Sequence, residues 1–435
     1  MNRLSRLVLA ALGLVVGSSA TRAADPTPVP PNVVLIISDD HGWTDYGFMG
    51  HPQVVSPNLD RLASQSQVYR RGYVTSSLCC PSLATLITGR YPHEHKVTSN
   101  DPPIPPGMRP AEFHRSEAFL QGRETMNKHL EALPTLPRLL SKKGYVSFQS
   151  GKWWQGDYSR GGFTDGMTRG QRHGDAGLEI GRQTLEPIDQ FMTRAKMANT
   201  PFFVWYAPMM PHTPHNPPEK YLAKAREKTP SIHLARYWAM IEWFDDSVGQ
   251  LLSSLDRLGL TENTMVIYVA DNGWTQDPAR GDSIRSKRSP YDAGLRTPIM
   301  VRWPGRVTPG VSDVPVLSID VAPTILAAAG VSRPEGMTGL DLTDLKAVAA
   351  RPSVQGACFT HNAVDLDDPD QNLLWRWMVK DRWKLILPKA GPDAPPAELY
   401  DVVADPAETR DLRADHPEIV RDLSARLDQW WRPAH

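Results

Sequence analysis

The stretch that decides the fold is Asn32-Val33-Val34-Leu35-Ile36-Ile37-Ser38-Asp39-Asp40-His41-Gly42. Its first part is an unbroken apolar run, which is typical of a strand that is buried on both faces of a parallel sheet. Two carboxylates and a glycine follow at once, and α/β proteins bind ligands at the carboxyl ends of such strands. The stretch therefore predicts an α/β fold with polar side chains gathered at one edge of a buried sheet.

A second stretch, Thr264-Met265-Val266-Ile267-Tyr268-Val269-Ala270-Asp271-Asn272-Gly273, repeats the same pattern. If both strands belong to one sheet, their ends direct four oxygen donors at one spot: Asp39, Asp40, Asp271 and Asn272. Carboxylate and amide oxygens without cysteine or histidine favour calcium or magnesium over zinc. Each pair alone also fits an ordinary turn or helix cap. The two pairs together predict one cation site, which we expect to hold calcium, with magnesium as the alternative.

A third motif, Cys79-Cys80-Pro81-Ser82-Leu83-Ala84-Thr85-Leu86-Ile87-Thr88-Gly89-Arg90, resembles the nucleophile signature of type I sulfatases. That signature reads Cys-x-Pro-Ser-Arg, four residues, then Thr-Gly, and the chain departs from it only at Leu83. In the family the cysteine is oxidised to formylglycine, whose hydrated aldehyde attacks the sulfur of a sulfate ester. The resemblance implies that Cys79 is the precursor of the nucleophile and that a formylglycine-generating maturase is a partner.

Three downstream motifs match the same family. They are Gly151-Lys152-Trp153, Pro211-His212-Thr213-Pro214, and Lys287 four residues before a Tyr-Glu-Gly-Gly-x-Arg-x-Pro-like block. The resemblance implies that Lys152 and His212 contact the sulfate, and that Lys287 and His212 stabilise and protonate the departing alcohol. Transfer of a sulfuryl group needs cations on its oxygens and a proton for the leaving group. Taken singly, each residue also fits a solvated lysine or a loop histidine.

Two departures from the family pattern fall on the surroundings of the nucleophile. Leu83 replaces the signature arginine, and Trp154 stands where the family usually has the histidine of Gly-Lys-Trp-His. Both family residues touch the formylglycine, so we expect these surroundings to be apolar here. One change removes side-chain volume and the other adds it, so we expect the two residues to pack together. The loss of the arginine weakens the maturation signal, and no other residue plainly substitutes for the histidine.

The two ends of the chain have distinct characters. Residues 1–23 carry Arg3 and Arg6, then an apolar run, then small residues, which predicts a signal peptide and export to the periplasm or medium. No later apolar run approaches the ~20 residues that span a bilayer. Three cysteines cannot build a disulfide framework. A formal net charge of zero argues against nucleic acid as a partner.

The size of the chain and the resemblance predict two structural units after the signal peptide. Residues 30–345 are expected to form a catalytic domain with a large mixed, mostly parallel sheet flanked by helices, as in alkaline phosphatase-like proteins. Residues 346–435 are expected to form a small antiparallel-sheet subdomain. The spacing of apolar residues predicts a helix over 237–258. The proline-rich segment 102–137 is expected to be irregular and to form part of the rim of the cleft.

The sequence thus predicts an exported sulfatase-like hydrolase that cleaves a sulfate ester, which we expect to be carried by a carbohydrate. A sulfated small molecule or glycan is the expected substrate. Two alternatives stay open: a phosphodiesterase or phosphonate hydrolase of the same superfamily, and a non-catalytic protein that binds sulfated glycans. Trp274 follows a predicted cation ligand and is expected to flank the substrate. His93 and His95 resemble a zinc pair but are expected to have a structural or substrate-rim role.

Overall fold

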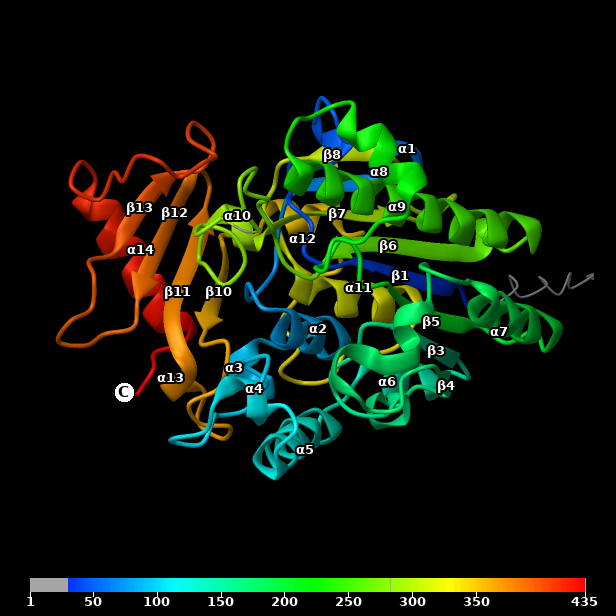
Figure 1. Ribbon diagram of the computed structural model, residues 1–435, viewed down its shortest axis with the longest axis horizontal. Coiled ribbons are helices and arrows are strands. Elements are labelled where there is room, and N and C mark those ends of the chain that lie inside the picture. Colours follow the sequence, from blue (N-terminus) through cyan, green and yellow to red (C-terminus); the bar gives the residue numbers. More distant parts are fainter. Residues whose placement is uncertain (1–29, 282, 435) are drawn as a thin grey trace, which may run out of the picture.

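The computed structural model describes residues 30–281 and 283–434, so the predicted signal peptide lies outside the described residues. A nine-stranded mixed sheet forms its centre (Figure 1). Eight strands follow one another across the sheet: β4 (Asp165–Gly166), β3 (Val146–Gly151), β5 (Phe202–Ala207), β1 (Asn32–Ser38), β6 (Thr264–Ala270), β7 (Arg296–Arg302), β2 (Gln67–Tyr73) and β8 (Gly310–Ser312). A short strand, β9 (Val316–Leu317), also pairs with β2.

The directions of the strands explain why the sheet is mixed but mostly parallel. The predicted strands β1 and β6 pair in parallel over their whole length, and β5 and β3 continue the parallel part on the other side of β1. β7 is antiparallel to both β6 and β2. β2 therefore runs in the same direction as β1. The predicted fold class is confirmed.

Helices cover both faces of the large sheet. Successive residues of β1 point to opposite faces, and because those from Val33 to Ile37 are all apolar, both faces need a covering layer. Val33 and Leu35 belong to the core under one layer of helices, while Val34 and Ile36 belong to the core under the other. The first layer contains α2 (Cys79–Thr88), α5 (Glu117–Glu131), α6 (Leu136–Ser141) and α11 (Val321–Ala328). The second contains α1 (Pro57–Ser64), α7 (Glu186–Met197) and α9 (Ile232–Arg257). α9 confirms the helix predicted over 237–258 and begins earlier.

A four-stranded antiparallel sheet forms the C-terminal part, at the left of Figure 1. Its strands are β10 (Val354–Phe359), β11 (Leu373–Lys380), β12 (Trp383–Pro388) and β13 (Glu398–Asp401). The last helix, α14 (Pro417–Trp430), buries Leu423 and Leu427 against this sheet. The small antiparallel subdomain is thus confirmed, whereas the predicted boundary at 345/346 stays a prediction.

The prediction of an irregular segment over 102–137 is wrong for most of its length. The segment contains α4 (Pro110–Phe113), the fifteen-residue helix α5 and the start of α6. α5 forms because Ser116 caps it by accepting from the Phe119 N–H, and because Met126 and Leu130 bury one side of it in the core. The prolines of the segment lie outside α5, either between the helices or in the first turns of α4 and α6, where they are tolerated.

The remaining short helices lie in the connections: α3 (Pro92–His95), α8 (Glu219–Arg226), α10 (Asp292–Leu295), α12 (Leu345–Ala349), α13 (Pro369–Asn372), and the 3₁₀ turns η1 (Gly47–Met49), η2 (Tyr158–Gly161), η3 (Arg172–Glu179), η4 (Thr261–Asn263) and η5 (Ser318–Asp320). Of these, η3 and α10 lie next to residues of the predicted site. Over the described residues, no helix combines the length and apolarity that crossing a membrane requires.

Candidate active site

The predicted site residues converge at the carboxyl edge of the large sheet. Asp39 and Asp40 follow β1, Asp271 and Asn272 follow β6, and Lys152 follows β3. Parallel strands end at the same edge, so these side chains are brought together by the sheet itself. β2 ends at this edge as well, because it runs in the direction of β1, and the nucleophile position at the start of α2 comes shortly after it.

The four predicted oxygen donors lie in one buried cluster. Asn272 Nδ2 donates to Asp40 Oδ1 at 2.7 Å, and the Asp40 backbone N–H donates to Asp271 Oδ1 at 3.2 Å. One potential metal-ligand atom from each of four residues lies within 4.8 Å of the other three: Asp39, Asp40, Cys79 and His212. The structure therefore places the predicted nucleophile and the predicted cation site next to each other.

Two buried lysines pair with these carboxylates. Lys152 Nζ lies 2.7 Å from the Asp39 carboxylate and 3.5 Å from Asp271 Oδ2, and Lys287 Nζ lies 2.6 Å from Asp40 Oδ1. Burial alone would lower the pKa of each lysine, but the carboxylates outweigh burial and raise both pKa values above the usual range. Both lysines therefore carry positive charge inside the site.

The carboxylates outnumber the ammonium groups. Burial raises the pKa of Asp271 to about 7, and Asp39 adds to the rise while Lys152 opposes it. Burial also acts to raise the pKa of Asp40, but Lys287 and other positive neighbours hold it well below its usual range. Three carboxyl groups face two ammonium groups, so full ionisation of the cluster would leave an excess of negative charge. A bound cation would offset this excess.

Cys79 is the first residue of α2, and its side chain is buried. Burial raises the pKa of its thiol to about 12, although Lys152 and Lys287 act to lower it.

The other end of the motif, at Gly89, has a structural role. Gly89 ends α2 with a φ of 64°, a conformation that favours glycine, and donates its N–H to the Thr85 carbonyl.

His212 faces the cluster from the loop after β5. Its Nδ1 donates to the Thr213 carbonyl at 2.5 Å, so in the neutral ring Nε2 carries no proton. Nε2 lies 3.5 Å from Asp40 Oδ2. Burial lowers the pKa of His212 to about 3, which keeps the ring neutral. The lone pair of His212 Nε2 thus faces the Asp40 carboxylate, and the two repel each other. A cation or a proton between Nε2 and Asp40 Oδ2 would relieve this repulsion.

The two residues that depart from the family pattern, Leu83 and Trp154, are both buried and belong to the same large apolar cluster, while their direct packing against each other stays a prediction. The expectation that the surroundings of the nucleophile are apolar is only partly correct, however. The Cζ atoms of Arg172 and Arg123 lie 4.8 Å and 5.3 Å from the ring centroid of Trp154. The Trp154 indole N–H has no hydrogen-bond partner among the described residues. Trp154 therefore lies between an apolar cluster, which includes Leu83, and two arginines near its ring, so its surroundings are apolar only in part.

A histidine that the sequence analysis did not identify, His173, lies beside Trp154. The two rings meet edge to face with centroids 4.5 Å apart, and the ring of His212 is 5.8 Å from that of His173. Burial, Lys152 and Arg172 lower the pKa of His173 far below its usual value, so its ring is neutral. The sequence signal is a run of three polar residues between glycines, Gly-Gln-Arg-His-Gly, which is typical of a functional loop.

The other histidines and the tryptophan that the sequence singled out lie outside this cluster. His93 stacks on Trp431 at 4.4 Å, and His95 Nε2 lies 3.2 Å from Thr85 Oγ1. These packing contacts fit the predicted structural role. Trp274 is almost fully buried, with its Nε1 donating to Gln276 Oε1 at 3.3 Å. The expectation that Trp274 flanks the substrate stays a prediction.

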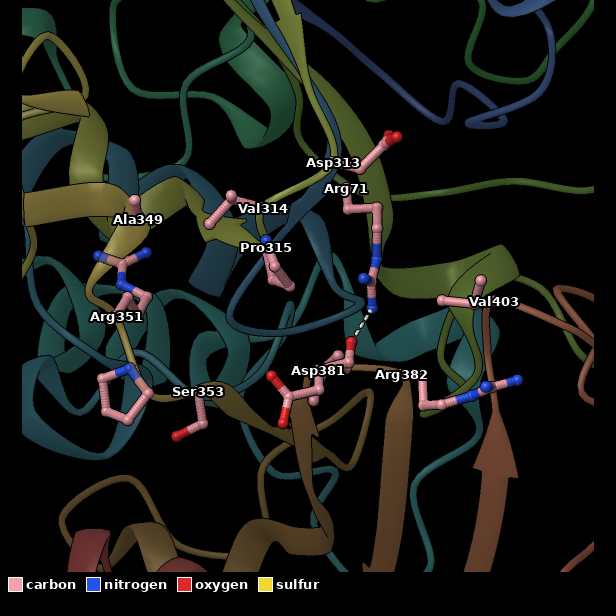
Figure 2. A pocket seen from close by; sticks show the side chains of 12 residues that line it. Arg71, Asp313, Val314, Pro315, Ala349, Arg351, Ser353, Asp381, Arg382 and Val403 are labelled. Atoms are coloured by element: carbon pink, nitrogen blue, oxygen red, sulfur yellow. Dashed lines mark hydrogen bonds between the residues drawn. The ribbon is translucent and has the colours of Figure 1, made fainter. Parts of the chain in front are cut away.

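A cavity of about 430 Å³ lies away from the predicted site, against the C-terminal sheet (Figure 2). Arg71 donates to the Asp381 backbone carbonyl across it at 2.7 Å. Its other cations are held by carboxylates: Arg351 pairs with Asp320, and Arg382 with Asp401. The cavity therefore has no group prepared for the chemistry of a sulfate ester.

Comparisons with known proteins agree with this geometry. The family described as Sulfatase matches residues 31–331, and the family described as N-sulphoglucosamine sulphohydrolase, C-terminal, matches residues 283–432. N-acetylgalactosamine-6-sulfatase of Mus musculus is 29% identical over 388 residues, covering 77% of this chain and 68% of its own. Arylsulfatase A of Homo sapiens is 30% identical over 371 residues, covering 73% and 68%.

The fold comparison gives the same result. The solved structure of Ps i-CgsB in complex with k-i-k-neocarrahexaose superposes with a TM-score of 0.73 at 21% identity, covering 92% of this chain and 93% of that one. At this identity the likeness shows the fold alone. Together with the family match over most of the chain, it means that this protein belongs to the Sulfatase family and is a sulfuric ester hydrolase.

Proposed function

We propose that this enzyme removes sulfate from a sulfated glycan through a formylglycine formed from Cys79, with one calcium ion at the carboxylate cluster. The observation that carries the proposal is the convergence of Cys79 with Asp40, Lys152 and Lys287 at one edge of the sheet. The anionic sulfate ester, the nucleophile at residue 79 and the positive charges of the two lysines would lie together at this edge. Magnesium is the alternative cation, since both ions prefer oxygen ligands.

The donor set fits a hard cation. Asn272 Oδ1 is buried and has no hydrogen-bond partner among the described residues, while its Nδ2 is fixed by Asp40. The amide thus adds a free acceptor to a cluster in which three carboxyl groups outnumber two ammonium groups. Asp39, Asp40, Asp271 and Asn272 would hold the ion, which when bound would offset that charge and attract the sulfate oxygens.

The environment of Cys79 supports its conversion. A thiol whose pKa is about 12 stays protonated at neutral pH, and a protonated thiol is a weak nucleophile. The hydrated aldehyde of formylglycine would supply the attacking oxygen when present. We expect Lys152 to contact the sulfate beside residue 79, since its Nζ lies 2.7 Å from the Asp39 carboxylate and its charge acts to lower the pKa of the Cys79 thiol.

Lys287 and His212 are proposed to serve the leaving group. Lys287 carries positive charge beside Asp40, and His212 presents an unprotonated Nε2 to the same carboxylate. Charge that develops on the departing oxygen would be stabilised by the ammonium group, which would also supply the proton that an alcohol needs, either directly or through Nε2 of His212.

A glycan is the proposed carrier of the sulfate because the relatives point to carbohydrates. N-acetylgalactosamine-6-sulfatase is named for a sugar sulfate, and Ps i-CgsB was solved with k-i-k-neocarrahexaose. Export, which the predicted signal peptide 1–23 would direct, places the enzyme where extracellular glycans occur. Both statements remain proposals for this chain.

Two measurements on protein from its own host test the proposal. The first is the mass and hydrazide reactivity of the peptide that contains residue 79. We expect an aldehyde, and in a foreign host we expect poor conversion because Leu83 interrupts the maturation signal. The second is the rate with an aryl sulfate against an aryl phosphodiester. Faster turnover of the phosphodiester would favour the phosphodiesterase reading, and a thiol at residue 79 in active protein would exclude the formylglycine mechanism.

A further inference from the structure

His173 is held beside the active site by a tightly packed loop, η3. The Trp153 N–H donates to the His173 carbonyl at 3.1 Å, which ties the loop to the segment that carries Lys152. A Cβ on Gly174 would lie 2.5 Å from the Gly151 carbonyl oxygen, so only glycine allows so close an approach. His173 itself has a φ of 71°, which costs free energy in a residue with a side chain. The loop therefore holds this imidazole in place against a backbone cost.

The His173 ring lies beside Trp154, the residue that replaces the family's histidine. Trp154 occupies the histidine position of Gly-Lys-Trp-His, and the His173 ring contacts the Trp154 ring with centroids 4.5 Å apart. On its other side, His173 approaches His212, which lies against Asp40. An imidazole from a different segment thus stands next to the place where the family has one.

A chain of charged groups fixes the tautomer of this imidazole. The carboxylate of Asp101, which is buried, accepts two hydrogen bonds from Arg172, at 3.0 Å and 2.9 Å. Arg172 Nη1 lies 2.9 Å from His173 Nε2. A guanidinium can only donate, so Nε2 is the acceptor and the proton of the neutral ring is on Nδ1. His173 is therefore a hydrogen-bond donor on the side away from Arg172.

We propose that His173 is a sulfate-binding residue of this enzyme, which donates its Nδ1–H to a sulfate oxygen and so replaces, from loop η3, the imidazole that Trp154 displaced. Arg172 is a positioning residue that keeps the proton on Nδ1. The inference rests on the proposed function, because it concerns the same bound sulfate group.

Binding of inorganic sulfate to the Cys79→Ala protein tests the inference without turnover. The variants are His173→Asn, whose amide nitrogen replaces Nδ1, His173→Gln, whose amide nitrogen replaces Nε2, and His173→Leu. We expect the leucine and glutamine variants to bind sulfate roughly 10-fold to 100-fold more weakly, the usual effect of losing a hydrogen bond to a charged group. His173→Asn should stay within about threefold of the parent. His114→Leu, at an exposed histidine, is the matched control and should not change the affinity.

Calorimetric titration measures the affinity, and thermal unfolding checks that each variant is folded. Arg172→Gln, which keeps a donor for Asp101, covers the case in which a His173 variant fails to fold. We expect it to weaken binding less than His173→Leu does. Parent-like binding by His173→Leu, or no binding of sulfate by the Cys79→Ala parent, would overturn the inference. Better binding by His173→Gln than by His173→Asn would overturn the tautomer assignment.

The same variants in the Cys79 enzyme separate this inference from the proposed function. Turnover of 4-nitrophenyl sulfate should follow the same order, with asparagine above glutamine and leucine. Sulfate binding that depends on His173 in a protein that hydrolyses no sulfate ester would support the inference and refute the proposed function. Normal turnover together with sulfate binding that is unchanged in the His173 variants would support the proposed function and refute the inference.

Discussion

Two buried clusters of lysines and carboxylates among the described residues differ in how completely their charges are paired. The site cluster is defined by Asp39, Asp40, Asp271, Lys152 and Lys287. The second, which we call the junction cluster, is defined by Lys384 of β12, Asp292 of α10, Glu408 and Arg296. Both are buried, and both join segments that are far apart in the sequence.

The junction cluster is balanced. Lys384 Nζ lies 2.8 Å from both Asp292 Oδ1 and Glu408 Oε1, and Arg296 lies 3.7 Å from Asp292. The Asp292 N–H and the Tyr73 hydroxyl donate to the remaining carboxylate oxygens at 2.6 Å and 3.1 Å. Two basic groups thus meet two carboxyl groups. The site cluster instead leaves one carboxylate in excess and a free amide oxygen, which marks it as a place prepared for a ligand.

The largest expected effect is that of a substitution at Asp271, which removes one carboxylate from the site cluster. Asp271→Asn should abolish stoichiometric calcium binding and lower kcat/KM for an aryl sulfate at least about 10³-fold, because a cation that offsets developing charge is lost. The metal-free variant should be at least as stable as the metal-free parent, since a neutral amide replaces a carboxylate that burial disfavours. Metal analysis, kinetics and thermal unfolding in chelator measure these quantities. Zinc at stoichiometric levels in the parent would contradict the calcium assignment.

Lys287 gives the second prediction, which concerns the leaving group. Lys287→Met should slow substrates with poor leaving groups about 10²-fold more than those with acidic phenols, because an acidic phenol departs with little help from a proton. His212→Asn should show the same trend. A series of aryl sulfates and a sugar sulfate measures it. Equal losses across the series would leave both residues with a binding role only.

Lys384 gives the matching prediction for the junction cluster. Lys384→Met leaves two buried carboxylates without their shared partner and should cost about 3–5 kcal/mol of unfolding free energy. Metal content should stay unchanged, because the site cluster shares no residue with it. Lys380→Met on the neighbouring strand removes an exposed pair with Asp422 and should cost under about 1 kcal/mol. Denaturant unfolding with metal analysis compares the two, and equal stability losses would refute the contrast.

The sequence predicted the site cluster well because each of its members ends a buried strand or belongs to a spaced motif. β1 and β6 could be identified from their apolar runs alone, and the order of their polar ends follows from parallel pairing. The junction cluster could not be predicted, since Lys384 and Asp292 are brought together only by the packing of the C-terminal sheet on the catalytic part. His173 was missed for a similar reason, because its contacts come from a loop whose path no periodic pattern reveals.

The smallest expected effect concerns pH and the acidic group of the junction cluster. Burial raises the pKa of Glu408 from 4.5 to about 7, and Asp292 adds to the rise while Lys384 opposes it. Because the pKa of Glu408 is higher in the folded state, binding of a proton to Glu408 favours the folded state. This contribution to the unfolding free energy is complete below about pH 4.5 and is lost as the pH rises through 7. The parent should therefore lose about 2–3 kcal/mol of stability between pH 5 and pH 8 through this group.

Glu408→Gln isolates that contribution, because glutamine resembles the protonated carboxyl and does not titrate. The variant should show a flatter dependence of unfolding free energy on pH over the same range, with the difference from the parent changing in the variant's favour toward pH 8. Denaturant melts at several pH values, carried out in chelator so that metal binding does not contribute, measure it. If parent and variant instead keep a constant difference at every pH, Glu408 is ionised throughout, and the junction cluster is a fully charged network rather than one that holds a shared proton.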